Sequence, residues 1–163
     1  MSTTDLPGWA HATGLLALTP ESTRGLEPTP AHAAMIDRMS RYAWAFDERR
    51  PDLLADNFTE DATWTADIRG EQRIGPHVGR DAIVAFMSGF WPEQTDQRRH
   101  MILNHLVTEL DGDSGTIISY HLLMSAAAEL VPVTSGFYSV RMRHEADGCW
   151  RISSLLAGYD IPF

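Results

Sequence analysis

The residues best placed to do chemistry in this chain are a carboxylate and an imidazole that lie far apart in the sequence, Asp47 and His100. Asp47 continues an apolar stripe with helical spacing, so it falls on the helix face that should be buried. That stripe consists of Ile36, Met39, Ala43 and Phe46. A buried charge needs a partner, and an Asp–His pair moves a proton near neutral pH, which predicts general acid–base catalysis. The alternative is an Asp that only ends a helix beside an arginine, with His100 as a satisfied core residue.

Two polar residues near this pair are candidates for binding a substrate. Asn104 lies four positions after His100 on a strand-like segment, which predicts that both side chains point to the same inward face. Its amide could hydrogen-bond a carbonyl or hydroxyl of a ligand, and a contact to the backbone is equally compatible with the pattern. Tyr42 lies one helical turn before Phe46 and could present its phenol as a donor or acid, or pack in the core with its hydroxyl at the rim.

A histidine and several aromatic residues complete the candidate site. Tyr120 and His121 are neighbours on a predicted strand, so only one can face inward, and the pattern of the strand favours His121. Trp64, Trp91 and Tyr138 offer aromatic surface suited to a flat, apolar ligand, although core packing would explain at least one of them. The predicted binding residues are therefore Tyr42, Trp64, Asn104, His121 and Tyr138.

The elements that must position these residues are predicted as helices followed by strands. Helices are expected at residues 30–48, where Thr29 is a credible N-cap, at 51–56 and at 80–90. Strands are expected at residues 62–66, 101–110, 116–124, 133–143 and 150–156, with hairpin turns at 111–113 and 146–148. Helices first and an antiparallel meander afterwards predict an α+β fold whose sheet curls round one helical layer.

Composition limits the classes of partner. The 163 residues are enough for one domain, which we expect at residues 30–163 after an irregular arm at 1–29. The net charge of −9 includes no lysine, so the surface should repel nucleic acid and anionic membranes. Cys149 is the only cysteine, which excludes an internal disulfide and fits the cytoplasm. The arm contains neither a signal-peptide pattern nor a membrane anchor.

Patterns for cofactor binding are absent from the sequence. There is no phosphate-binding glycine loop, no dinucleotide fingerprint and no Gly-x-Ser-x-Gly turn, so no nucleotide cofactor is expected. The seven histidines form no His-x-His or His-Glu-x-x-His pattern, and His100 and His105 should point to opposite faces of their strand. We therefore expect no metal site and no cofactor.

A series of short motifs, taken together, resembles a known family. They are Tyr42, Ala45 and Asp47; Leu54, Phe58 and Asp61-Ala62; Gly79 to Ile83; Arg99-His100 with Asn104; Asp111-Gly112-Asp113; Gly136-Phe137-Tyr138; and Gly148 to Ile152. Their order and spacing are similar to the SnoaL-like branch of the nuclear transport factor 2 (NTF2)-like superfamily. This resemblance implies a cone-shaped barrel, in which a curved antiparallel sheet wraps around N-terminal helices and encloses one apolar pocket. It also implies an Asp–His pair, as in scytalone dehydratase and a dehydrochlorinase of this superfamily, and Asp47 and His100 match those positions.

The predicted function is that of a cofactor-independent lyase or isomerase, of the dehydratase or cyclase type, acting on a small, apolar, ring-containing metabolite. Polyketide or other secondary metabolism would supply such substrates. One alternative is a non-catalytic ligand-binding or assembly module, because the fold does not fix the chemistry. A less favoured alternative is an epoxide hydrolase, which would need an Asp-Arg-Asp set that the strands do not offer. The outer face of the curved sheet predicts a homodimer or a larger homo-oligomer.

Overall fold

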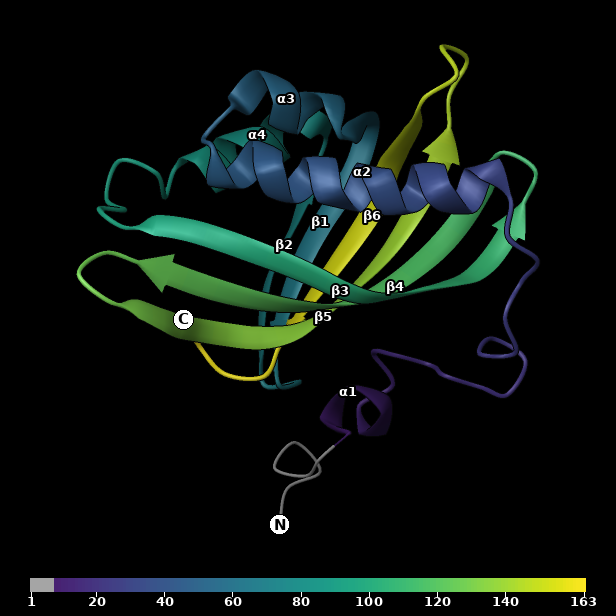
Figure 1. The fold of residues 1–163 in the computed structure, drawn as a ribbon, viewed down its shortest axis with the longest axis horizontal. Coiled ribbons are helices and arrows are strands. Elements are labelled where there is room, and N and C mark those ends of the chain that lie inside the picture. Colours follow the sequence, from purple (N-terminus) through teal and green to yellow (C-terminus); the bar gives the residue numbers. More distant parts are fainter. Residues whose placement is uncertain (1–7) are drawn as a thin grey trace.

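A computed structural model describes residues 8–163 of the chain, and Figure 1 shows its fold. The helices within this range are α1 (Trp9–Ala12), α2 (Pro30–Asp47), α3 (Pro51–Asp56) and α4 (Arg80–Ser88). The strands are β1 (Phe58–Ile68), β2 (Gln72–Val78), β3 (Gln97–Asp111), β4 (Ser114–Ala126), β5 (Leu130–His144) and β6 (Trp150–Tyr159).

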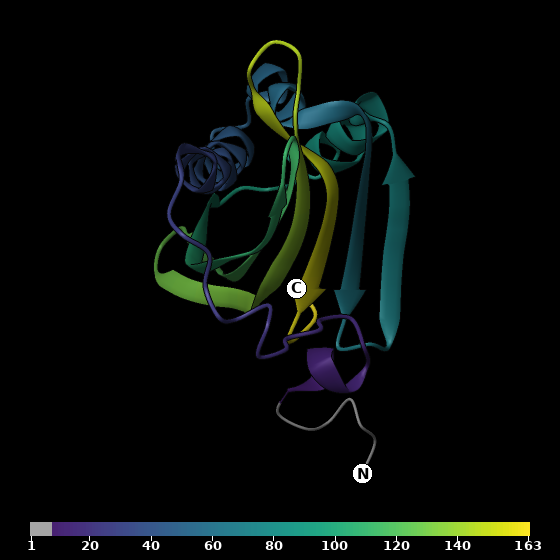
Figure 2. The same cartoon turned by 90° about the vertical axis from the view of Figure 1, so that its right-hand side faces the viewer.

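The strands form one curved sheet in the order β2-β1-β6-β5-β4-β3. Neighbouring strands are antiparallel except β1 and β6, which run parallel. Figure 2 shows the sheet bending around the layer that contains α2, α3 and α4. The predicted α+β class and the cone of curved sheet on helices are thus confirmed. The parallel pair was not predicted, because alternation along a strand does not identify its partner.

The predicted helices form for the expected local reasons. The Thr29 hydroxyl accepts a hydrogen bond from the backbone N–H of His32, and Pro30 occupies the first helical position, where it needs no hydrogen-bond partner. The helix predicted at 51–56 has those bounds, whereas α4 ends at Ser88, two residues before the predicted end. Strand β2 was missed because Gly75 and Pro76 indicate a turn; as an edge strand it tolerates proline.

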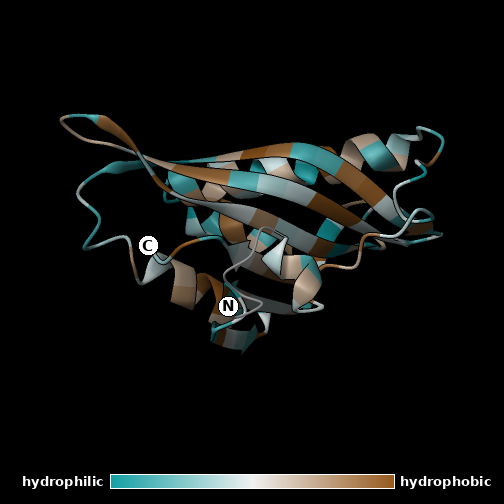
Figure 3. Ribbon diagram, turned by 90° about the horizontal axis from the view of Figure 1, so that it is seen from below, coloured by the Kyte–Doolittle hydropathy of each residue, from teal (hydrophilic) through white to brown (hydrophobic). Residues whose placement is uncertain are grey.

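The main core lies between the concave face of the sheet and the helices. Its completely buried side chains include Met35, Met39, Ile117, Val140 and Ile152. Figure 3 shows hydrophobic and hydrophilic residues alternating along the strands, as expected for a sheet with one face on the core. Tyr42, Trp64 and Tyr138 belong to this core and also line a cavity inside the cone.

The arm before α2 packs on the opposite face of the sheet. Trp9 of α1 lies against Phe137 of β5, with ring centroids 5.7 Å apart, and its indole N–H donates to Asp160 Oδ1 over 2.8 Å. Leu15, Leu16 and Leu156 extend this small cluster. The part of the predicted arm at residues 1–7 lies outside the described residues. The described part of the arm contributes no side chain to the cavity in the cone.

Candidate active site

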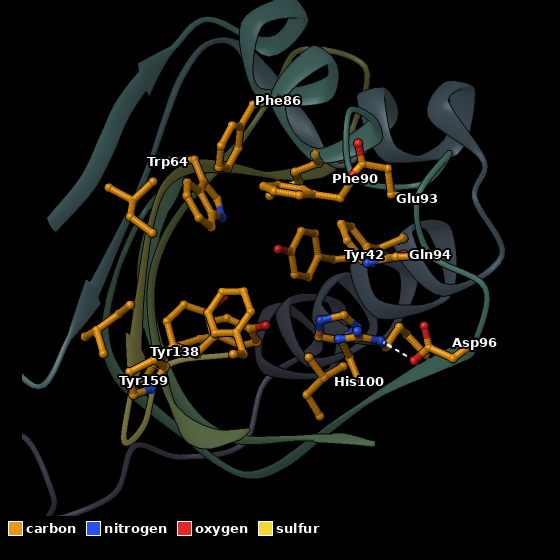
Figure 4. A pocket seen from close by; sticks show the side chains of 18 of the residues that line it. Tyr42, Trp64, Phe86, Phe90, Glu93, Gln94, Asp96, His100, Tyr138 and Tyr159 are labelled. Carbon is orange, nitrogen blue, oxygen red and sulfur yellow. Dashed lines mark hydrogen bonds and ion pairs between the residues drawn. The ribbon is translucent and has the colours of Figure 1, made fainter. Parts of the chain in front are cut away.

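A cavity of about 650 Å³ lies inside the cone, within the range of small-molecule sites. Its walls come from α2, α4, the concave face of the sheet and the loop that follows α4. Figure 4 shows the aromatic side chains on these walls and a few polar groups between them. Among the lining residues are Tyr42, Trp64, Phe86, His100, Tyr138 and Tyr159.

The structure brings Asp47 and His100 together at the edge of this cavity. Asp47 is the last residue of α2, and His100 lies near the start of β3. The ring Nδ1–H of His100 donates to Asp47 Oδ1 over 2.6 Å, and the backbone N–H of His100 donates to Asp47 Oδ2 over 2.8 Å. The side chains are only 5% and 11% exposed, so little solvent competes for these bonds. The pair predicted from the sequence therefore exists as a buried contact.

This arrangement leaves one nitrogen of His100 available for chemistry. A carboxylate can only accept hydrogen bonds, so Asp47 favours the tautomer that carries its proton on Nδ1. Nε2 then has a free lone pair, and within residues 8–163 it forms no hydrogen bond. His100 lines the cavity, whereas Asp47 does not, and the imidazole and Phe46 rings meet edge to face with centroids 4.9 Å apart. The geometry suits a base that removes a proton from a ligand in the cavity.

Tyr42, Trp64 and Tyr138, all predicted as binding residues, line the cavity. The rings of Tyr42 and Tyr138 meet edge to face at 5.9 Å. Burial raises the pKa of both phenols well above its ordinary value, so both hydroxyls keep their protons and can act as donors. Trp64 of β1 is 5% exposed, and its ring centroid lies 5.2 Å from that of Phe86 in α4. These residues form a rigid aromatic wall.

His121 faces inward as predicted, but it does not line the cavity. Its ring is 2% exposed and stacks on Tyr138 at 4.5 Å. Its Nε2–H donates to the backbone oxygen of Gly158 over 3.2 Å. Burial lowers the pKa of His121 to about 4, so the ring stays neutral near neutral pH. His121 therefore supports Tyr138 from behind, and the predicted contact with a substrate has no counterpart in this arrangement.

The predicted position of Asn104 on the inner face is wrong. A β-bulge between Leu103 and Leu106 interrupts the pairing of β3 with β4, and Asn104 adopts a left-handed backbone with φ of 53°. The side chain is exposed and is not among those lining the cavity. The bulge also turns His105 inward, where its Nδ1 is 2.7 Å from the hydroxyl of Ser119. His100 and His105 thus share a face, contrary to prediction, because strict alternation fails at a bulge.

Several polar residues that the sequence did not identify also line the cavity, and Arg98 is the basic one among them. Its Nε donates to Asp96, and the hydroxyl of Ser125 donates to the same carboxylate. These contacts, from Ser125 first and Arg98 second, lower the pKa of Asp96. Within residues 8–163, Arg98 forms an ion pair with Asp96 alone, so it is not part of an Asp-Arg-Asp set. Only the two-residue spacing between Asp96, just before β3, and Arg98 in β3 could have indicated this pair.

Residues 8–163 contain no group of three or more His, Cys, Asp or Glu side chains arranged to hold a metal ion. No helix in the described part of the chain is long and apolar enough to cross a membrane.

Comparison with known proteins supports the fold described above. The SnoaL-like domain family matches residues 28–155, and no curated protein matches the chain. A Catenulispora acidiphila protein in complex with S-DNPA is 24% identical, covering 79% of this chain and 92% of that protein, with a TM-score of 0.69. ActVI-ORFA from Streptomyces coelicolor is 20% identical over 80% and 98% of the two chains, with a TM-score of 0.67. An NTF2-like protein with a cystatin-like fold from Novosphingobium aromaticivorans is 17% identical, covering 78% of this chain and 80% of that protein, with a TM-score of 0.66.

Proposed function

This chain belongs to the SnoaL-like domain family, and from that membership and its cavity we propose that it is a cofactor-independent lyase or isomerase, of the dehydratase or cyclase type. The family and fold are those of small-molecule binding proteins and of isomerases and cyclases. The observation that carries the enzymatic proposal is the Asp47–His100 hydrogen bond, which leaves His100 Nε2 facing the cavity. A purely structural histidine would not need a free nitrogen at the wall of an apolar cavity.

In the proposed reaction, His100 Nε2 removes a proton from a carbon atom next to a carbonyl group of the substrate. Asp47 fixes the tautomer and orientation of the ring and stabilises the imidazolium that forms. The electron pair of the C–H bond moves into a new C–C double bond, and the carbonyl oxygen becomes an enolate oxygen. The Tyr42 hydroxyl donates to that oxygen. The aromatic walls limit water in the cavity, which strengthens these polar contacts.

The cavity also supports the proposed class of substrate. Its lining sets aromatic rings opposite a polar side that includes Glu93, Gln94 and Arg98, which suits a small molecule that contains an apolar ring and carries a polar group. The Catenulispora acidiphila relative was solved in complex with S-DNPA, and this supports the binding of a small molecule in the same fold. Membership of the SnoaL-like family supports polyketide or other secondary metabolism as the proposed setting.

The proposal can be tested without knowing the natural substrate. 2-Tetralone is a bicyclic ketone with acidic protons beside its carbonyl group, and their exchange in deuterium oxide can be followed by NMR. We expect the wild-type protein to accelerate this exchange over buffer, and His100→Gln to reduce the acceleration by about 10²- to 10⁴-fold. His105→Gln is the matched control, because His105 faces inward on the same strand but does not line the cavity.

A wild-type rate equal to that of buffer would contradict the proposal. An acceleration that His100→Gln leaves intact would contradict the assignment of the base. Binding of 2-tetralone without exchange would instead favour the non-catalytic ligand-binding module.

A further inference from the structure

The indole N–H of Trp64 is buried without a hydrogen-bond partner. Trp64 is 5% exposed, and its Nε1 forms no hydrogen bond within residues 8–163. A buried donor in this state costs free energy, and most buried donors in proteins are paired. Trp9 illustrates the usual outcome, since its indole N–H donates to Asp160. The open donor on Trp64 therefore calls for an explanation.

The position of Trp64 indicates what would satisfy this donor. Trp64 lines the cavity, and Figure 4 shows its indole nitrogen on the side of the ring that faces Tyr42. The N–H lies close enough to the Tyr42 hydroxyl to offset part of the rise in the pKa of Tyr42, but outside hydrogen-bond geometry. The two donors thus converge on one region of the cavity. A single acceptor atom of a ligand could bind both.

The indole is held in place by its neighbours. The rings of Phe86 and His77 lie 5.2 and 5.9 Å from Trp64, and these two rings stack on each other at 3.8 Å. A donor that is already oriented does not have to be ordered when charge develops on a ligand, and this makes it effective in stabilising an anion. The indole N–H is also a donor only, so it cannot bind a ligand amine or hydroxyl hydrogen.

We propose that Trp64 Nε1–H and the Tyr42 hydroxyl together bind one oxygen of the substrate, and that this oxygen is the carbonyl of a ring-bearing ketone. The inference rests on the proposed function, in which His100 removes a proton from the carbon next to that carbonyl. As the C–H electron pair forms the C–C double bond, the C=O pair moves onto oxygen, and both donors keep their protons. Figure 4 shows Tyr42 between Trp64 and His100, so the base and the two donors face the cavity from different sides.

The experiment compares two probes of similar size, 2-acetylnaphthalene, which carries a carbonyl group, and 2-ethylnaphthalene, which does not. Dissociation constants are measured by isothermal titration calorimetry. We expect wild type to prefer the ketone by about three- to tenfold, the usual effect of one net hydrogen bond. Trp64→Phe should reduce this preference through weaker binding of the ketone, because only the Tyr42 hydroxyl then remains to donate to its oxygen. Trp91→Phe should keep it, because Trp91 also has a buried, unpaired N–H but does not line the cavity.

A preference for the ketone that Trp64→Phe leaves undiminished, or that is absent from wild type, would overturn the inference. If Trp64→Phe does not fold, the ¹⁵N spectrum of the wild-type protein tests whether the Trp64 N–H contacts the ketone. The Trp64 indole signal, assigned through its contact with Phe86, should move on adding the ketone and less on adding the hydrocarbon. Equal shifts would refute the contact.

Binding does not require the base, so the comparison is repeated in His100→Gln. A preference that is reduced in Trp64→Phe but unchanged in His100→Gln supports the donor even if the 2-tetralone exchange fails. That combined outcome would separate a ketone-binding site from the proposed catalysis.

Discussion

Replacing Asp47 tests the central pair at the level of both stability and chemistry. Asp47→Ala removes the acceptor of two hydrogen bonds, one from the backbone N–H and one from the ring of His100. Each buried donor left unpaired costs about 1–3 kcal/mol, and the ring can recover part of this by turning to the cavity. We therefore expect Asp47→Ala to lower the free energy of unfolding by about 3 kcal/mol, a large share of the 5–15 kcal/mol typical of a domain.

The sign of this effect is informative because Asp47 is the last residue of α2. A negative charge at a helix C-terminus is disfavoured by the helix dipole, so removal of an unpaired acid there would stabilise the protein slightly. Glu48, the next residue, is the matched control. Its side chain is 45% exposed and pairs with Arg99 over 2.7 Å. We expect Glu48→Ala to change the stability by no more than about 0.5 kcal/mol.

Asp47→Asn separates the chemistry from the stability. The amide oxygen can accept from the His100 backbone N–H, while the amide NH₂ donates to Nδ1 and so places the ring proton on Nε2. Stability should fall by only about 1 kcal/mol, whereas 2-tetralone exchange should fall by about 10²- to 10⁴-fold. Urea unfolding measures the change in stability, and the NMR assay measures the change in the rate of 2-tetralone exchange. An Asp47→Ala cost no larger than that of Glu48→Ala, or an Asp47→Asn variant with wild-type exchange, would refute this reasoning.

Two other predictions concern His121 and Asn104. Because burial lowers the pKa of His121 from 6.5 to about 4, the unfolded chain binds more protons between these values, and stability falls as the pH drops through this window. We expect His121 to account for a loss of about 3 kcal/mol in the free energy of unfolding between pH 6.5 and 4, measured by urea titration. The stability of His121→Gln should depend less steeply on pH. Equal pH dependence of the two proteins would show that His121 does not titrate in this way. At Asn104, where φ is 53°, Ala should cost about 1 kcal/mol and Gly should be neutral or stabilising. Both variants should keep wild-type exchange of 2-tetralone, and a large loss would mean that Asn104 reaches the substrate after all.

Much of this fold could be predicted because its local signals agree with one another. Thr29 and Pro30 mark the start of α2, and Pro51 marks that of α3, through capping and backbone rules that act within a few residues. The turn at 111–113 ends β3 as predicted, with Gly112 in a left-handed conformation. These features depend only on neighbouring residues. The contact of Asp47 with His100 could be predicted because a carboxylate on a buried face needs a partner and the resemblance to the SnoaL-like branch indicated His100.

The errors arose where the outcome depends on distant strands. The bulge at Asn104 exists because β3 pairs with β4 in a register that a two-residue period cannot reveal. Strand β2 pairs with β1 although Gly75 and Pro76 suggest a turn, since an edge position leaves one side of the strand free. Pairing partners, and not local preference, decided both cases.

The candidate site adds a second limit, because facing inward is not the same as reaching the cavity. His100, His105 and His121 all lie on the inner face, but only His100 lines the cavity. His121 is covered by Tyr138, and His105 is paired with Ser119. An unpaired nitrogen is not sufficient either, since His121 Nδ1 has no partner and lies away from the cavity. A group can act on a ligand only when the fold leaves it unpaired and its residue lines the cavity, and within the described residues His100 Nε2 and Trp64 Nε1 are two such atoms on different walls.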